Sequence, residues 1–166
     1  MKLRFWYSVY AATEDVPSPS AMPKSLRPPI QGLIHELEPD GEQWRSGRFR
    51  LSTSAHPAIL VRRERRGDDE LLRKLEDAES CLREMLNEPH RDLVLSQIAR
   101  TQQVIYLTPC PGIELGPSKL ARMCEQLCGF LARTSDGLIQ VYQEGFFNSQ
   151  GESLLPYNPR HRLKTI

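Results

Sequence analysis

The sequence predicts an α+β fold, a single domain in which about three main helices pack on one face of a mostly antiparallel sheet. Three observations support this prediction. Several segments alternate polar and apolar residues with period two, as strands do. Three other segments carry apolar residues at helical spacing. These helical segments cluster after the first strands, which is the pattern of α+β proteins.

The first part of the chain is dominated by predicted strands. Residues 3–10 alternate with period two and contain several aromatic side chains, which predicts a strand. Five prolines between residues 17 and 29 exclude a long helix there, although a short one fits residues 20–26. An antiparallel meander is predicted next, with strands at residues 32–37, 48–52 and 58–65 and turns at Asp40-Gly41 and His56-Pro57.

Helices dominate the middle of the chain. Asp68, Asp69 and Glu70 place negative charge at the start of a helix, where the helix dipole favours it. This helix has the clearest periodicity in the chain, with Leu71, Leu75, Ala78, Leu82 and Met85 on one stripe that Leu72 and Leu86 widen. Two further helices are predicted, one ending near Thr101 and one over residues 117–133. The remaining strands are expected at residues 104–107, 138–142, 146–147 and 153–155.

Charge and hydropathy argue against some functions. The chain has 22 Lys and Arg against 21 Asp and Glu, and this balance argues against a dedicated nucleic-acid binder. No apolar run approaches the roughly 20 residues of a membrane span. The N-terminal segment lacks the pattern of a signal peptide, so we expect a cytoplasmic protein. We expect one domain over residues 1–155 and a basic, extended tail over residues 156–166.

The four cysteines, Cys81, Cys110, Cys124 and Cys128, form no CxxC motif. Cys124 and Cys128 share one face of a predicted helix, where two thiolates could begin a metal site. A zinc site of thiolates needs a second close pair, which the sequence lacks. We therefore interpret both as small core residues, and we predict neither a metal nor a cofactor.

Candidates for nucleophilic catalysis are few. Cys110 lies between two prolines in a predicted loop, and its activation would require a histidine close by in space. The histidines are His35, His56, His90 and His161. The segment Gly116-Pro117-Ser118-Lys119 starts a helix after a strand and could hold an anion, but we favour the simpler interpretation of an ordinary helix cap.

Two groups of charged residues allow other hypotheses. Asp136, Glu144 and Glu152 lie near the ends of the C-terminal strands, where carboxylates bind cations or transfer protons. Asp136 and Glu144 each precede a glycine, so we favour structural turns. The run Arg62-Arg63-Glu64-Arg65-Arg66 could contact phosphates. We favour a solvated strand edge, or pairing with the acidic residues just after it in the sequence.

A local pattern in the C-terminal third points to a family resemblance. A helix ending in residues 127–134 is followed by Asp136-Gly137-Leu138-Ile139-Gln140-Val141, by residues 144–147 and by a turn that ends at Gly151. Together with residues 5–12, this pattern resembles that of small bacterial α+β proteins similar in style to the immunity proteins that neutralise toxins. The resemblance covers about 40 residues and implies a protein partner. It carries over no binding residue, because immunity proteins bind through surfaces that differ from case to case.

The leading prediction is a non-enzymatic domain that binds another protein and occludes a site on that partner. A toxin is one candidate for the partner. Residues 68–88 hold eight acidic and three basic residues, which suits a basic partner. Trp6, Tyr10 and Trp44 would form a hot spot if they were partly exposed and clustered, but we favour core packing for them. The candidate binding residues are Asp68, Asp69, Glu76, Asp77, Glu84 and Trp44. The alternative functions are a small enzyme that uses Cys110 or the C-terminal carboxylates, and a nucleic-acid accessory protein that uses residues 62–66.

Overall fold

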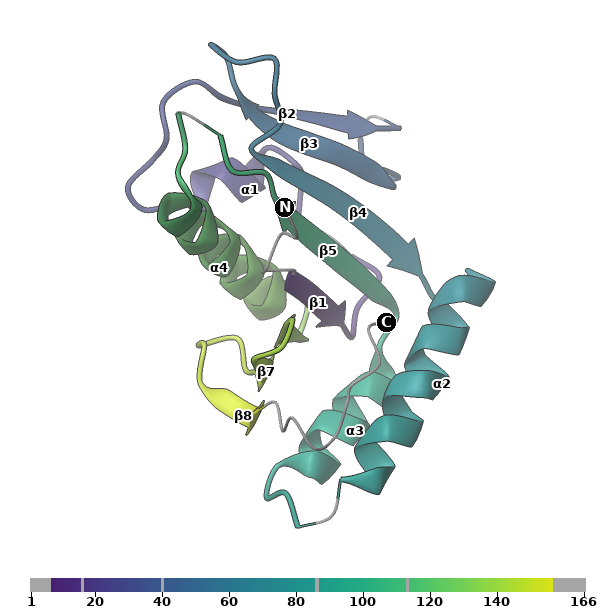
Figure 1. Ribbon diagram of the computed structural model, residues 1–166. Coiled ribbons are helices and arrows are strands. Elements are labelled where there is room, and N and C mark those ends of the chain that lie inside the picture. The colour runs from purple at the N-terminus through teal and green to yellow at the C-terminus, as the bar shows by residue number, and fades with distance from the viewer. Residues whose placement is uncertain (1–6, 16, 40, 86, 113, 157–166) are drawn as a thin grey trace.

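The computed structural model describes residues 7–15, 17–39, 41–85, 87–112 and 114–156. Eight strands form the sheet: β1 Tyr7–Ala11, β2 Leu33–Glu38, β3 Ser46–Leu51, β4 Ile59–Arg65, β5 Gln103–Pro109, β6 Gly137–Val141, β7 Gly145–Phe147 and β8 Ser153–Pro156. The helices are α1 Ala21–Lys24, α2 Asp69–Glu84, α3 Arg91–Arg100 and α4 Pro117–Thr134. The α+β class, the antiparallel sheet and the order of these elements are confirmed (Figure 1).

The sheet has the strand order β2-β3-β4-β5-β1-β6-β7-β8, and every neighbouring pair is antiparallel. The first strand lies in the middle, because β1 pairs with β5 on one side and with β6 on the other. Tyr7 faces Leu107 across one of these pairs and Val141 across the other. The predicted strand over residues 3–10 is confirmed from Tyr7 onward, and its first residues lie outside the described ranges.

Helices cover both faces of the sheet, so the prediction that they pack on one face is wrong. Tyr7 and Val9 belong to a hydrophobic cluster with α4, whereas Tyr10 belongs to a second cluster with α2 and α3. Neighbouring residues of a strand point to opposite faces. The central strands carry apolar residues at consecutive positions, such as Val104 and Ile105, and each face therefore needs its own cover. Figure 1 shows α4 and the α2–α3 pair on different sides of the sheet.

Helix α2 uses the predicted stripe with one exception. Leu71, Leu75, Ala78 and Leu82 are buried against the second cluster. Leu72 remains 38% exposed, so it does not widen the stripe. Its side chain lies roughly 100° around the helix from that of Leu71, which turns it away from the sheet. Leu86 lies outside the described residues.

The buried carboxylate of Glu64 fixes the first turns of α2 to the sheet. Lys74 on α2 donates to both oxygens of this carboxylate, at 3.0 and 3.2 Å. The Tyr106 hydroxyl on β5 donates to it at 2.9 Å, and the Arg62 guanidinium lies 2.6 Å from it. Lys74 also sits 5.0 Å from the centre of the Tyr106 ring. These contacts hold α2 in a fixed position relative to β4 and β5.

Helix α4 packs on the other face with its cysteines inward. Cys124 and Cys128 are fully buried among the leucines of the first cluster, which confirms their interpretation as core residues. Burial raises the pKa of the Cys124 thiol to about 12 and raises that of Cys128 well above its ordinary value. Both side chains therefore behave as small apolar groups at neutral pH.

The C-terminal end of the described chain is a strand. Ser153–Pro156 pairs with β7 as the last strand of the sheet. The predicted basic tail begins at Pro156, and its remaining residues, 157–166, lie outside the described ranges. Among the residues that the structure describes, no helix combines the length and the apolar character that a membrane span needs.

Candidate functional site

The outer surface of α2 carries four exposed carboxylates, Asp69, Glu76, Asp77 and Glu84, which we call the α2 acidic face. None of the four forms an ion pair with a residue that the structure describes. The neighbouring Glu79 forms a long ion pair, with 3.9 Å between its Oε2 atom and the Arg83 guanidinium. The α2 acidic face thus offers carboxylates that no ion pair among the described residues engages, with Arg73 and Arg83 as the exposed cations on the same helix. It contains four of the six predicted binding residues.

Asp68, the fifth predicted residue, is used within the fold. Its Oδ2 atom accepts a hydrogen bond from the backbone N–H of Arg65 at 2.8 Å and another from Arg45 at 2.7 Å. The backbone hydrogen bond, followed by the charge of Arg45, lowers the pKa of the Asp68 carboxyl. Glu70 is engaged in a similar way, because Lys74 first and then Arg62 lower its pKa. Asp68 fixes the start of α2 and is not part of the α2 acidic face.

Trp44, the sixth predicted residue, is fully buried, so it does not lie on the surface where a partner could contact it. The indole belongs to the cluster that α4 covers, and the Arg63 guanidinium lies 5.5 Å from its ring centre. Tyr10 is also buried, with its hydroxyl donating to Gln140 at 2.8 Å. Core packing accounts for both residues, and Trp6 lies outside the described ranges. The structure therefore shows no aromatic hot spot among the described residues.

The basic run over residues 62–66 does not form one patch. Strand β4 lies between β3 and β5, so the hypothesis of a solvated sheet edge is wrong. The side chains alternate across the strand, and Arg63 is buried while Arg62 is exposed and pairs with Glu70 at 3.2 Å. Arg66 donates to two backbone carbonyls, at 3.1 Å each. The predicted pairing with the start of the acidic helix is confirmed for Arg62.

The three C-terminal carboxylates are scattered and serve turns. Asp136 has a positive φ of 49° and accepts a hydrogen bond from Arg100 at 2.6 Å. Glu152 accepts one from Asn148 at 2.7 Å, across the turn between β7 and β8. Glu144 is exposed in the turn after β6. This arrangement supports the structural interpretation of all three.

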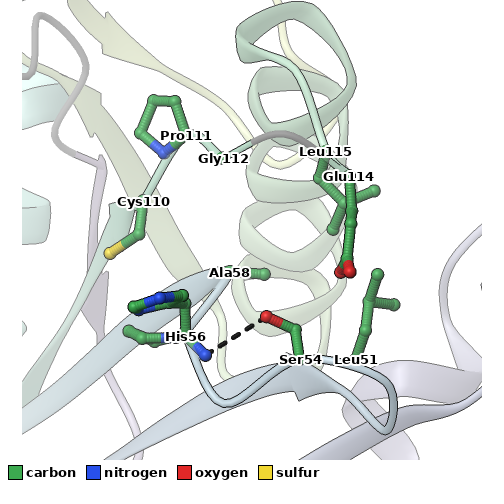
Figure 2. A pocket seen from close by; sticks show the side chains of 10 residues that line it. Leu51, Ser54, His56, Ala58, Cys110, Pro111, Gly112, Glu114 and Leu115 are labelled. Atoms are coloured by element: carbon green, nitrogen blue, oxygen red, sulfur yellow. Dashed lines mark hydrogen bonds between the residues drawn. The ribbon is translucent and has the colours of Figure 1, made fainter.

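A cavity of about 500 Å³ brings Cys110 and His56 together. Figure 2 shows their side chains at one end of the cavity and Glu114 at the other. The cavity lies where the loop before β4 meets the loop after β5, because Ile59 pairs with Pro109 at the adjacent ends of those strands. No local pattern in the sequence marks Glu114, so only the fold reveals its place in this cavity.

The thiol of Cys110 is not activated in this cavity. Burial raises its pKa, so the thiolate is scarcer than in a free cysteine at the same pH. Its hydrogen bond goes to the backbone oxygen of Thr108, at 3.7 Å. The backbone N–H of His56 donates to Ser54 at 3.2 Å, which holds the histidine loop in place. A nucleophile is activated by a base within hydrogen-bonding reach or by a lowered pKa. The Cys110 thiol has a backbone oxygen as its partner and its pKa is raised, so neither route applies.

We expect the cysteines to react slowly and in two classes. At about pH 8, Ellman's reagent should titrate the half-buried Cys81 and Cys110 in the native protein, more slowly than free cysteine, because burial raises the pKa of both. The buried Cys124 and Cys128 should react only after unfolding. The rates of the first pair should rise steadily as the pH is raised. A Cys110→Ser variant shows how much of the reaction in the native protein is due to Cys110. A cysteine that reacts faster than free cysteine at neutral pH would contradict this account.

These features define a small α+β domain with an acidic helix on one side of its sheet and a pair of neighbouring cavities on the other. No protein-family model, curated protein or solved structure matches the chain. Its function is therefore inferred from the geometry of these surfaces.

Proposed function

We propose that this chain is a non-enzymatic binding domain that docks a basic protein on the α2 acidic face and occludes a site on that partner. The observation that carries the proposal is the set of four exposed carboxylates without cation partners among the described residues. Charges of one sign on a surface steer an oppositely charged partner and raise its rate of association. The resemblance to immunity proteins favours a toxin as the partner.

The rigidity of α2 supports this proposal. Its inner side is buried from Leu71 to Leu82, and the contacts of Lys74 with Glu64 tie it to the sheet. Asp68 fixes its first turn through Arg65 and Arg45. A surface held in this way loses little conformational entropy when a partner binds, and this increases the affinity available from a given set of contacts.

Site-specific photo-crosslinking tests the location of the docking surface. Ser80 is exposed on α2 between Asp77 and Glu84, so a photoreactive phenylalanine analogue at this position should crosslink to the partner in cells of the source organism. The same analogue at Glu125, exposed on α4 on the opposite side of the sheet, is the matched control. We expect one basic protein to be crosslinked from Ser80 and not from Glu125. Crosslinking from Glu125 alone, or from neither position, would contradict the proposal.

A further inference from the structure

A second cleft, of about 600 Å³, lies beside the first one. Its walls are the segment after α1, the loop before α4 and the first turns of α4. Leu51, Glu114 and Leu115 line both cavities, so the two adjoin. Helix α4 packs on the face of the sheet opposite to α2. The cleft is therefore separate from the α2 acidic face, and a ligand bound in it would serve a role beyond the proposed docking function.

The charge of this second cleft is positive. Arg27, Lys119 and Arg122 line it, against the single carboxylate of Glu114. Within the described part of the chain, Lys119 and Arg122 form neither a hydrogen bond nor an ion pair through their side chains. Among the described residues, the guanidinium of Arg27 donates only to backbone oxygens, at 2.8 and 2.9 Å, so its charge is not neutralised by an acid. The cleft thus presents a surplus of positive charge to a ligand.

The floor of the cleft is apolar. Leu115 and Met123 lie there with 5% and 3% of their surface exposed, and both belong to the cluster under α4. Ile30 and Leu51 are half-buried and pack against the same cluster. A fully hydrated ion such as phosphate gains nothing from such a floor, whereas a ligand with an apolar body buries surface on it.

The two walls are fixed to each other by a reciprocal pair of hydrogen bonds. The backbone N–H of Arg27 donates to Oε1 of Gln126 at 2.8 Å, and Nε2 of Gln126 donates to the backbone oxygen of Arg27 at 2.8 Å. This clamp joins α4 to the proline-rich segment after α1. The cleft is therefore present before any ligand arrives, which lowers the cost of binding.

We propose that this cleft binds a small amphipathic organic anion, of the class formed by medium-chain carboxylates. The anionic group lies between Lys119 and Arg122, and the apolar chain covers Leu115 and Met123 and extends past Leu51 toward the first cavity. The combination of unpaired cations with an apolar floor selects this class over simple anions and over neutral lipids. Glu114, at the junction of the cavities, disfavours a second negative charge on the chain.

Fluorescence of the dye 8-anilinonaphthalene-1-sulfonate, itself an apolar body with one negative charge, tests the site in the full chain. We expect saturable binding to the wild-type protein and about tenfold weaker binding to the double variant Lys119→Gln/Arg122→Gln, because this variant removes the two exposed charges that contact the anionic group. The matched control is Lys24→Gln/Arg133→Gln, which removes two exposed charges outside the cleft. Circular dichroism verifies that all three proteins are folded.

Competition identifies the class of ligand. Decanoate should displace the dye at concentrations about tenfold lower than decanol, because only decanoate carries the charge. Inorganic phosphate should not displace it. The proposal is overturned if binding is not saturable, if the control variant loses as much affinity as Lys119→Gln/Arg122→Gln, if decanol competes as well as decanoate, or if phosphate alone competes.

Discussion

Replacing Arg63 by alanine is expected to lower the free energy of unfolding by about 3–5 kcal/mol, because hydrogen bonds from a charged donor contribute about 1.5–3 kcal/mol each. The side chain is 3% exposed and lies between separate parts of the fold. Its guanidinium donates to Oε1 of Gln103 at 2.7 Å, to the backbone oxygen of Glu42 at 2.7 Å and to that of Glu14 at 3.1 Å. A further bond to the backbone oxygen of Trp44 is long, at 3.5 Å. The alanine variant would leave the buried acceptors on Gln103 and Trp44 without this donor.

The acceptors of Arg63 are neutral oxygens, so hydrogen bonds and not an ion pair hold its charge within the fold. Burial first, and then repulsion from Arg65 and Arg45, lowers the pKa of its guanidinium to about 10. The group is still charged at neutral pH, and its charge is stabilised by oriented carbonyl and amide oxygens. Arg63→Lys should lose most of the same stability, because a single ammonium group cannot reach acceptors on three segments.

Urea unfolding followed by circular dichroism measures this loss. The matched control is Arg48→Ala, an exposed arginine on the neighbouring strand β3 that pairs with Glu36 on the surface. It should cost less than about 1 kcal/mol, as exposed ion pairs do. A loss of similar size in the two variants would show that Arg63 does not hold the segments together.

Trp44→Ala should also lower the free energy of unfolding strongly, by about 3–5 kcal/mol. The indole has no exposed surface and packs in the cluster that contains Phe49 and Ile59. Removing it leaves a cavity in the core and takes away the ring that faces the Arg63 guanidinium at 5.5 Å. The measurement is again urea unfolding.

Trp44→Phe separates the ring from its N–H group. The Nε1 atom of Trp44 is buried without a hydrogen-bond partner among the described residues, so the N–H adds no stability. The phenylalanine variant should therefore lose clearly less than the alanine variant, by the difference in buried volume alone. Equal losses for both variants would contradict the packing explanation. Because Trp44 and Arg63 are in contact, the combined variant Arg63→Ala/Trp44→Ala should lose less than the sum of the two.

Much of the fold can be predicted from local patterns in the sequence. The period of two in β4 and the stripe from Leu71 to Leu82 identify their elements because side-chain direction repeats with the backbone. The central position of β1 cannot be predicted in this way, because strand order depends on pairings between distant segments. The same applies to the helices on both faces. Consecutive apolar residues such as Val104 and Ile105 indicate that β5 is buried on both faces, but not which helix covers which face.

The candidate sites show the same division. The acidic character of α2 is visible in the sequence because its charges belong to one helix. That Asp68 is engaged by Arg45 and Arg65 depends on how the loop before α2 folds back. The alternation of β4 puts Arg63 on one side of the sheet, but its burial arises from loops that close over it. Cys110 and His56 meet only because β4 and β5 are paired, and no local signal reports that pairing.

The central claim is that the α2 acidic face docks a basic protein, and the association rate constant tests it most directly. Once the crosslinked partner is purified, its association is measured by stopped-flow at low and high ionic strength. The test variant is Asp69→Asn/Glu76→Gln/Asp77→Asn/Glu84→Gln. The matched control, Glu14→Gln/Glu42→Gln/Glu125→Gln/Glu144→Gln, removes the same charge from exposed positions elsewhere.

We expect the wild type and the control to associate at least about tenfold faster at low salt than at high salt, because electrostatic steering is screened by ions. The variant of the α2 acidic face should be slower at low salt and nearly insensitive to salt. Equal rates and equal salt dependence for the test and control variants would contradict the account, and would place the docking surface elsewhere on the domain.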